Sequence, residues 1–167
     1  MLPYTLLIAA VGIERVVELF VSQRNLKWSR ARGGIEFGAG HYPVMVLLHT
    51  ALLAGCLVEA AYRPFIPALG WPMLAVVIAA QVLRWWCIAT LGRQWNTRVV
   101  VVPDARRVTG GPYRFIPHPN YVAVVVEGIA LPLVHSAWIT AVVFTVLNAA
   151  LLRVRISVEN NALESLR

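Results

Sequence analysis

Residues 109–121, which read TGGPYRFIPHPNY, bring together side chains suited to binding a polar ligand. The three prolines fix backbone angles and remove hydrogen-bond donors, and the two glycines permit turns that other residues resist. The side chains that offer flat faces or hydrogen-bonding groups are Tyr113, His118, Asn120 and Tyr121. A preordered loop of this kind suits a flat, polar, cytosolic ligand such as an adenine nucleoside. The alternative interpretation is a stiff turn that its tyrosines anchor at a membrane interface.

Arg155 and Glu159, which lie four positions apart, are a second pair of candidate ligand-binding residues. Residues four apart share one face of a helix, so these two side chains are neighbours if the last helix continues that far. They either bond to each other or face a ligand together. Facing a ligand, the glutamate would accept from a ribose or an amino group, and the arginine would hold an anionic oxygen.

Further ionisable residues interrupt apolar segments of roughly 20 residues. Four of them lie seven residues from the expected inner end of their segment, about 10 Å deep at 1.5 Å per residue: Glu14, His49, Arg84 and Glu127. Arg15 and Glu18 lie beside Glu14. Because charge is costly in lipid, such residues are functional candidates. The layer predicts either salt bridges that tie the helices together or a polar chamber open to the cytoplasm.

The composition decides what kind of scaffold must position these groups. The 167 residues are 59% hydrophobic and 14% charged, with a mean hydropathy of +0.67. A soluble domain of this size could not cover so much apolar surface. We therefore expect one all-α integral membrane domain over residues 1–167, with about five transmembrane helices. The expected spans lie near 2–21, 42–62, 71–91, 120–134 and 137–153.

The net charge of +7 is unevenly placed along the chain. Twelve of the 15 basic residues fall in the connection 22–41, the loop 92–119 and the tail 154–167, or directly beside them. By the positive-inside rule these segments face the cytoplasm, which predicts a multi-pass protein of the inner membrane. We attribute the charge to anionic lipids and expect no nucleic-acid partner. Residues 22–41 are expected to lie on the headgroups and are a candidate lid over the site.

For three further residues we expect no role in a functional site. Cys56 and Cys87 lie inside apolar segments without a CxxC or His/Cys cluster, so we expect packing roles and no metal site. Glu59, near the outer end of its segment, is expected to be an unrelated interfacial residue.

The stretch GPYRFIPHPNY resembles the GPYR-x-x-RHPxY signature of the isoprenylcysteine carboxyl methyltransferase family, integral membrane enzymes that use S-adenosylmethionine. RISVE, with Leu163 beyond it, resembles the arginine, glutamate and leucine of the family's second motif. Pro117 stands where the family has an arginine, and Asn160 and Asn161 replace part of an acidic run. Two longer stretches, ERVVELFVSQRNLKWSRARGGIEFGAGHYPVMVLLH and GRQWNTRVVVVP, resemble a small bacterial subgroup found with type III polyketide synthases. That subgroup methylates a hydroxyl of alkylresorcinols or alkylpyrones.

The resemblance implies roles by position. The residues it places against S-adenosylmethionine are Arg107, Val108, Tyr113, His118, Pro119, Asn120, Tyr121 and Glu159. It places Arg155 against the acceptor, and it requires no metal. Because a phenol has a pKa near 10, a hydroxyl acceptor profits from a base or a nearby cation. The candidate bases are His49, Glu14, Glu18 and Glu127, in that order, and the candidate cations are Arg84 and Arg155.

The sequence therefore predicts an S-adenosylmethionine-dependent O-methyltransferase that acts on a lipophilic acceptor taken from the membrane. One alternative is methylation of a prenylated cysteine carboxylate or of a phospholipid amine. Another is a membrane scaffold or transporter fragment without enzyme activity. Transport is disfavoured because the chain shows neither inverted repeats nor broken midplane helices.

Overall fold

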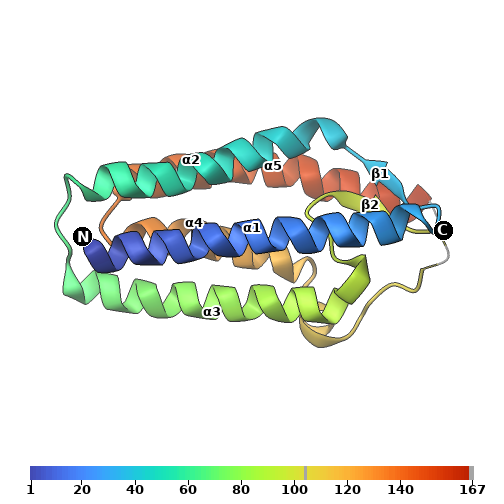
Figure 1. Ribbon diagram of the computed structural model, residues 1–167, viewed down its shortest axis with the longest axis horizontal. Helices are drawn as coiled ribbons and strands as arrows, with labels where there is room; N and C mark the ends of the chain where they lie inside the picture. The colour runs from blue at the N-terminus through green and yellow to red at the C-terminus, as the bar shows by residue number, and fades with distance from the viewer. Residues whose placement is uncertain (104, 166–167) are drawn as a thin grey trace.

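The computed structural model describes residues 1–103 and 105–165 as five α helices that run lengthwise beside one another (Figure 1). The helices are α1 (Leu2–Arg30), α2 (Tyr42–Ala60), α3 (Pro67–Leu91), α4 (Pro119–Leu133) and α5 (Trp138–Ser165). Prolines stand in the first turn of each, where a missing N–H costs nothing, except in α5. The all-α architecture and the five helical segments agree with the expectation from the sequence.

Two helices extend further than predicted. α1 continues to Arg30, so residues 22–30 do not form a separate segment on the headgroups as expected. The reason is tertiary, because Ser22, Asn25 and Ser29 form a buried polar stripe on that part of the helix. α5 likewise continues through the expected tail as far as Ser165, and residues 166–167 of that tail lie outside the described residues.

Among the described residues, three helical segments are long and apolar enough to cross a membrane. They are Ala39–Ala60, Pro67–Gln94 and Trp138–Glu164, to which the apolar but shorter Pro119–Leu133 is added. α1 has the length but carries Glu14, Arg15 and Glu18 in its middle. The count of five spans stays a prediction.

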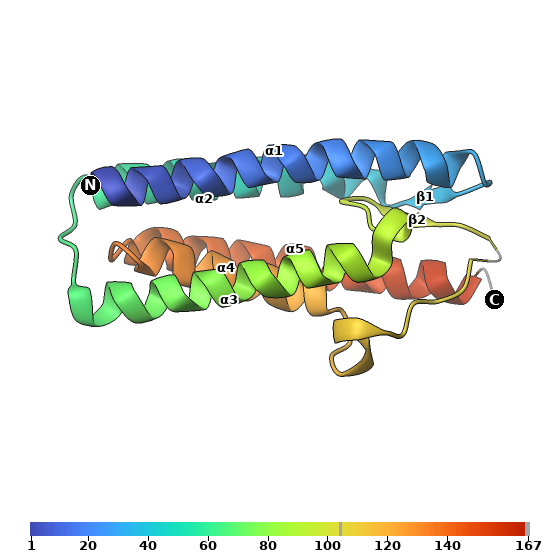
Figure 2. The same cartoon turned by 60° about the horizontal axis from the view of Figure 1, so that its bottom comes forward.

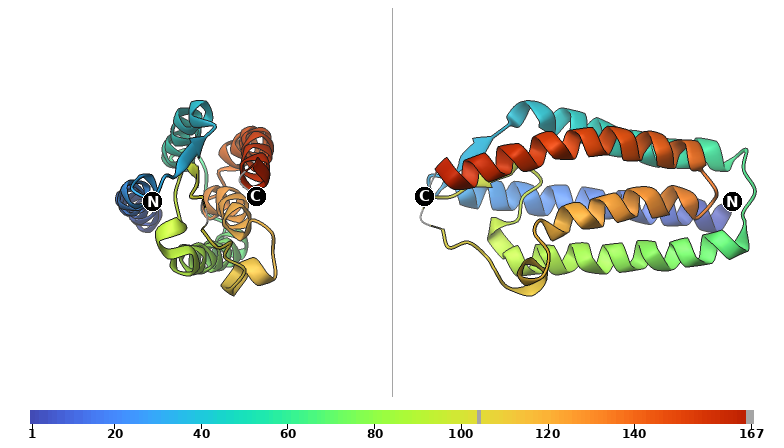
Figure 3. Two further views of the ribbon diagram at one scale, coloured as in Figure 1. Left: turned by 90° about the vertical axis from the view of Figure 1, so that its right-hand side faces the viewer. Right: turned by 180° about the vertical axis from the view of Figure 1, so that it is seen from behind.

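The helices form two layers. α1 and α2 lie over α3, α4 and α5 (Figure 2), and the end-on view shows α4 between α3 and α5 (Figure 3). Gly128 of α4 allows the close approach to α5, because a Cβ there would lie 2.1 Å from the Phe144 ring. The hydrophobic core includes Tyr4, Ile8, Leu131 and Phe144, and the Tyr4 hydroxyl donates to the Leu131 carbonyl at 3.0 Å.

A short antiparallel sheet, which the sequence did not indicate, closes one end of the bundle. β1 (Ile35–Phe37) pairs with β2 (Val99–Val101), with Glu36 opposite Val100. The Arg98 guanidinium donates to Glu36 at 2.7 Å beside the ladder. The connection between α1 and α2 is thereby attached to the long loop after α3. Three 3₁₀ turns complete this end: η1 (Ala39–His41), η2 (Gly92–Gln94) and η3 (Gly111–Arg114).

The opposite end holds the N terminus and shows a helix cap that corrects the expectation for Glu59. Its carboxylate accepts hydrogen bonds from the backbone N–H groups of Ile139 at 3.1 Å and Thr140 at 2.8 Å. These are the free N–H groups of the first turn of α5, where a carboxylate is favoured. Glu59 therefore joins α2 to α5 and is not an unrelated surface residue.

Candidate functional site

A cavity of about 310 Å³ lies at the sheet end of the bundle, between β2, the loop that follows it, α4 and α5. We call it the loop cavity. Seven of the eight residues that the sequence places against a cofactor line it: Arg107, Val108, Tyr113, His118, Asn120, Tyr121 and Glu159. The eighth residue, Pro119, does not line the cavity. It is the buried first residue of α4. Side chains from distant parts of the sequence thus meet around one space.

Three of these residues hold one another. The Tyr121 hydroxyl donates to Oε2 of Glu159, and the His118 ring stacks on the Tyr121 ring with centroids 5.5 Å apart. His118 Nδ1 lies 3.5 Å from Oε1 of Glu159, and its Nε2 bonds Oδ1 of Asn160 at 3.1 Å. The hydrogen bond to Glu159 raises the pKa of His118, since both ring nitrogens face oxygen acceptors. Asn160, where this chain departs from the family pattern, thus forms a hydrogen bond with His118.

The turn before His118 has a backbone conformation that favours glycine at Gly111. Gly111 has φ +55°, and a Cβ there would lie 2.5 Å from Oγ1 of Thr90. The turn therefore packs directly on the end of α3. The Tyr113 hydroxyl is buried against the Cys87 thiol, and burial raises the pKa of Tyr113. Cys56 and Cys87 are both free and fully buried, as packing residues are expected to be.

A second cavity, of about 270 Å³, lies deeper in the bundle between α1, α2, α4 and α5. We call it the helix cavity. Most of its lining is apolar, for example Val16, Leu53 and Leu152. The arginine, glutamate and histidine residues in its lining are Arg15, Glu18, His49, Arg84 and Arg155. This is the kind of space that a lipid with a polar head would fill.

The two cavities meet. Five residues line both of them, and we call these the shared wall: Trp95, Asn96, Asn120, Tyr121 and Arg155. The loop cavity and the helix cavity therefore adjoin at these side chains.

Arg155, one of the shared-wall residues, contacts Tyr121, Met45 and Thr97. It is 5% exposed, and its Nε donates to the Tyr121 hydroxyl at 3.0 Å. Nη1 contacts Sδ of Met45 at 2.9 Å, and Nη2 donates to the Thr97 carbonyl. No described carboxylate forms an ion pair with it, because Glu159 reaches it only through the Tyr121 hydroxyl. The predicted pair thus shares a partner, and the guanidinium lies beside both cavities without a direct ion pair to a described carboxylate.

The predicted polar layer is mostly an ion-pair network. Arg15 donates to Glu18 at 2.7 Å and to Glu127 at 2.8 Å, and Arg84 donates to Glu127 at 2.9 Å. Glu14 accepts from Gln81 and Trp85 on α3. This geometry favours the interpretation of salt bridges that tie α1 to α3 and α4. Catalytic roles for Glu14, Glu127 and Arg84 stay predictions.

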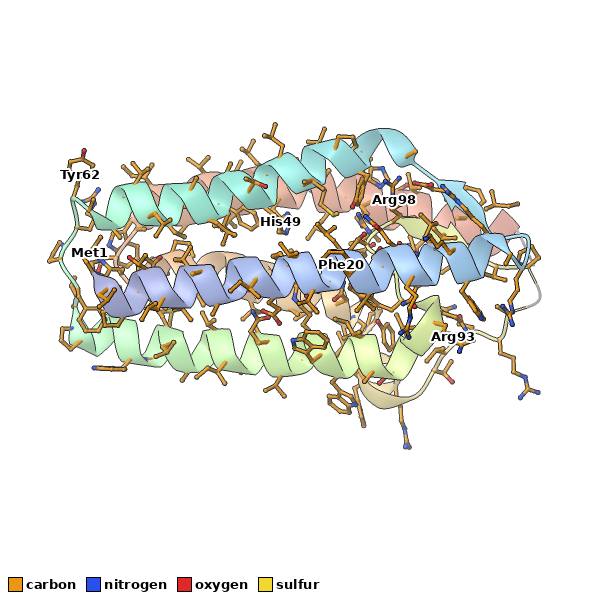
Figure 4. All side chains as sticks on the ribbon, in the orientation of Figure 1. Met1, Phe20, His49, Tyr62, Arg93 and Arg98 are labelled. Carbon is orange, nitrogen blue, oxygen red and sulfur yellow. The ribbon has the colours of Figure 1, made fainter. Side chains whose placement is uncertain are left out.

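His49 stands apart from that network, in the space between α2 and α1 (Figure 4). Its Nδ1 lies 2.9 Å from the Met45 carbonyl, and a carbonyl can only accept, so Nδ1 carries the proton. Nε2 is then left with a lone pair and has no hydrogen-bond partner among the described residues. The ring meets Phe144 edge-on, with centroids 5.4 Å apart. His49 is therefore the predicted base whose geometry leaves it free to accept a proton.

The structure adds site residues that sequence reasoning missed. Asn25 donates through Nδ2 to the Trp95 carbonyl at 2.7 Å, and Ser22 Oγ bonds Oδ1 of Asn96 at 2.7 Å. These bonds hold η2 and the shared wall against α1. The signal was available in the spacing Ser22, Asn25, Ser29, which places three polar residues on one helical face. Asn148, buried in the middle of α5, was also missed.

One family model and two bacterial proteins are similar to this chain. The family model described as the isoprenylcysteine carboxyl methyltransferase (ICMT) family matches residues 73–165, more than half of the chain. A protein of Bacillus subtilis (strain 168), named Uncharacterized protein YpbQ, is 36% identical over 162 residues that cover 96% of each chain. An uncharacterized protein of Haemophilus influenzae is 26% identical over 154 residues, 91% of this chain and 90% of the other. The family match begins in α3 and ends in α5, so it contains the whole shared wall but neither α1 nor α2.

Proposed function

The chain belongs to the isoprenylcysteine carboxyl methyltransferase (ICMT) family, a family of membrane methyltransferases, and we propose that it methylates a hydroxyl of a lipophilic acceptor with S-adenosylmethionine as the donor. We propose further that the acceptor resembles an alkylresorcinol or an alkylpyrone. The observation that supports this best is the shared wall between a cavity open to the loop end and an apolar cavity among the helices. A soluble donor and a lipid acceptor each have a space there, and the two spaces adjoin.

The residues of the loop cavity fit the donor. Glu159 offers a carboxylate for ribose hydroxyls or an amino group, and His118 and Tyr121 offer stacked ring faces. Oδ1 of Asn120 is buried without a hydrogen-bond partner in the described chain, which a bound ligand would supply. Arg107 lines the cavity and provides a cation although Pro117 replaces the family's arginine. S-adenosylmethionine supplies an electrophilic methyl group on a sulfonium sulfur, so the protein has mainly to align the reacting atoms.

Two residues suit the acceptor oxygen. The Arg155 guanidinium, which lacks a carboxylate partner among the described residues, stabilises negative charge that develops on the oxygen. The lone pair of His49 Nε2 accepts the hydroxyl proton. His49 lies four residues, about 6 Å, deeper than Met45, which touches the Arg155 guanidinium. This arrangement favours an oxygen nucleophile over a phospholipid amine, which gains nothing from a cation.

We propose that the loop end of the bundle faces the cytoplasm and that all five helices cross the inner membrane. The donor then enters from the cytosol, and the acceptor enters from the lipid with its tail among the apolar residues of the helix cavity. The concentration of basic residues near the loop end supports this orientation.

Titration calorimetry in detergent with S-adenosylmethionine and S-adenosylhomocysteine tests the donor. We expect the wild type to bind both, and Glu159→Gln to weaken binding by about tenfold, the cost of a charged hydrogen bond. Glu164→Gln is the matched control, since Glu164 is an exposed acid on the same helix. Absence of binding to the wild type, or an equal loss in both variants, would contradict the proposal. Mass spectrometry with resorcinol, pyrone, prenylcysteine and phospholipid-amine acceptors side by side then identifies the acceptor class.

A further inference from the structure

Unpartnered polar atoms gather around the helix cavity. The buried side-chain atoms without a hydrogen-bond partner in the described chain number seven, and four belong to residues that line this cavity. They are two donors and two acceptors: Arg84 Nε, Trp95 Nε1, Asn120 Oδ1 and Asn148 Oδ1. Leaving a buried polar atom unpaired destabilises the folded protein, so native proteins rarely tolerate it without a ligand or a role.

Asn148 is the one of these four that belongs neither to the shared wall nor to the ion-pair network. Trp95 and Asn120 belong to the shared wall, and Arg84 belongs to the ion-pair network. Asn148 is 2% exposed and stands in the middle of α5, a helix apolar enough to cross a membrane. An amide there would be replaced by an apolar side chain if packing alone were needed.

The position of Asn148 relative to Arg155 indicates what it would contact. The two residues are seven apart on α5, so they share a face, and Asn148 lies roughly 10 Å deeper. His49 packs on Phe144, one helical turn before Asn148, so the imidazole and the amide line the same level of the cavity. His49 Nε2 and Asn148 Oδ1 are both acceptors without a donor among the described residues. This level of the cavity therefore suits a head group that donates hydrogen bonds.

We propose that Asn148 is a specificity-determining residue that accepts a hydrogen bond from a second hydroxyl of the acceptor, distinct from the hydroxyl that is methylated. This inference rests on the proposed function, because it assumes that the helix cavity holds the acceptor. It names the acceptor class as a lipid whose ring carries at least two hydroxyl groups. A carboxylate head group, which only accepts hydrogen bonds, could bond Asn148 Nδ2 but would leave Oδ1 without a donor.

The test compares two probes that differ in one hydroxyl: pentylresorcinol and a pentylphenol with the tail in the same meta position. Binding to the full-length protein in detergent is measured by titration calorimetry without S-adenosylmethionine, so that the result does not depend on activity. We expect the wild type to bind pentylresorcinol about tenfold more tightly, which is the effect of one hydrogen bond to a buried partner. Asn148→Leu, of similar size, should bind both probes equally and pentylphenol as tightly as the wild type does.

Unchanged discrimination in Asn148→Leu, or a wild type that binds both probes equally or neither, would show that the assignment is wrong. If Asn148→Leu does not fold, judged by its thermal unfolding in detergent, Asn148→Ala provides the same comparison with a smaller side chain. The proposed function fails separately. Probes that bind with the expected dependence on Asn148 but are not methylated would overturn the reaction and leave the role of Asn148 standing.

Discussion

His118 and Glu159 come from two motifs that lie 41 positions apart, yet their side chains share one corner of the loop cavity. Both ring nitrogens of His118 face oxygens, which favours the imidazolium form. Arg155 and Glu159 reach each other only through the Tyr121 hydroxyl. At the scale of single residues, the site is thus a chain of alternating donors and acceptors that runs from His118 to Arg155.

The raised pKa of His118 makes this corner sensitive to pH. The pKa in the folded protein lies above the ordinary value of about 6.5. The stabilisation by protonated His118 is therefore complete below that ordinary value and is lost as the pH rises through the raised pKa. We expect His118→Gln to be less stable than the wild type by up to about 1 kcal/mol at about pH 6, and by less at about pH 9.

Thermal unfolding in detergent at several pH values measures this difference. The comparison between the two proteins removes the contributions of all other titrating groups. A stability difference that stays constant over the whole pH range would show that His118 does not carry the proton.

The helices are joined by polar contacts at defined points along their length. α1 is held to α3 and α4 by Arg15 and to the shared wall by Ser22 and Asn25. At the far end, Glu59 of α2 caps the first turn of α5. Helices without a hydrophobic driving force between them in lipid depend on such contacts and on close packing.

Replacement of Glu59 tests the cap. We expect Glu59→Ala to lose about 1–2 kcal/mol of stability, because two backbone N–H groups of α5 lose their acceptor. Arg63→Ala is the matched control, since it removes the 3.4 Å ion pair with Glu59 but leaves the cap intact, and should cost less than about 0.5 kcal/mol. The measurement is thermal unfolding in detergent. Equal effects of the two substitutions would mean that the ion pair, and not the cap, stabilises this end.

At the scale of the whole molecule, the two cavities are lined by different parts of the chain. The segment that matches the family runs from α3 to α5 and provides most of the loop cavity and all of the shared wall. α1 and α2, outside that match, provide nearly half of the residues that line the helix cavity. The loop cavity, our proposed donor site, thus belongs to the part that matches the family, and the helix cavity, our proposed acceptor site, depends also on a part that the family model does not cover.

The proposed orientation can be tested with a membrane-impermeant maleimide. Cys56 and Cys87 are the only cysteines and are fully buried, so the wild type should show little labelling. Arg63 and Arg93 lie before and after α3, and both are exposed. We expect Arg93→Cys to be labelled in inside-out vesicles and Arg63→Cys in right-side-out vesicles. Labelling of both from one side would contradict a crossing by α3, and the reverse pattern would contradict the orientation.

The sequence by itself indicated where the five helices lie, although not how far α1 and α5 extend, and which residue types surround the loop cavity. A long apolar segment in lipid satisfies its own backbone hydrogen bonds by forming a helix, and prolines mark where four of these helices begin. The motif residues from Arg107 to Tyr121 could be assigned to one site because they lie close together along the chain. Seven of the eight residues assigned to the cofactor do line one cavity.

Only the tertiary structure decided how distant residues pair. Glu127 bonds Arg15, 112 positions away, and Ser22 bonds Asn96, 74 positions away. The extension of α1 to Arg30 and the strand pair β1–β2 also depend on partners that local pattern does not reveal. Composition and periodicity report the local state of a segment, whereas such contacts depend on which faces the packed helices turn toward one another. The same holds for Asn148. Only the packing of the helices shows that this residue lines a cavity and that its buried Oδ1 has no hydrogen-bond partner in the described chain.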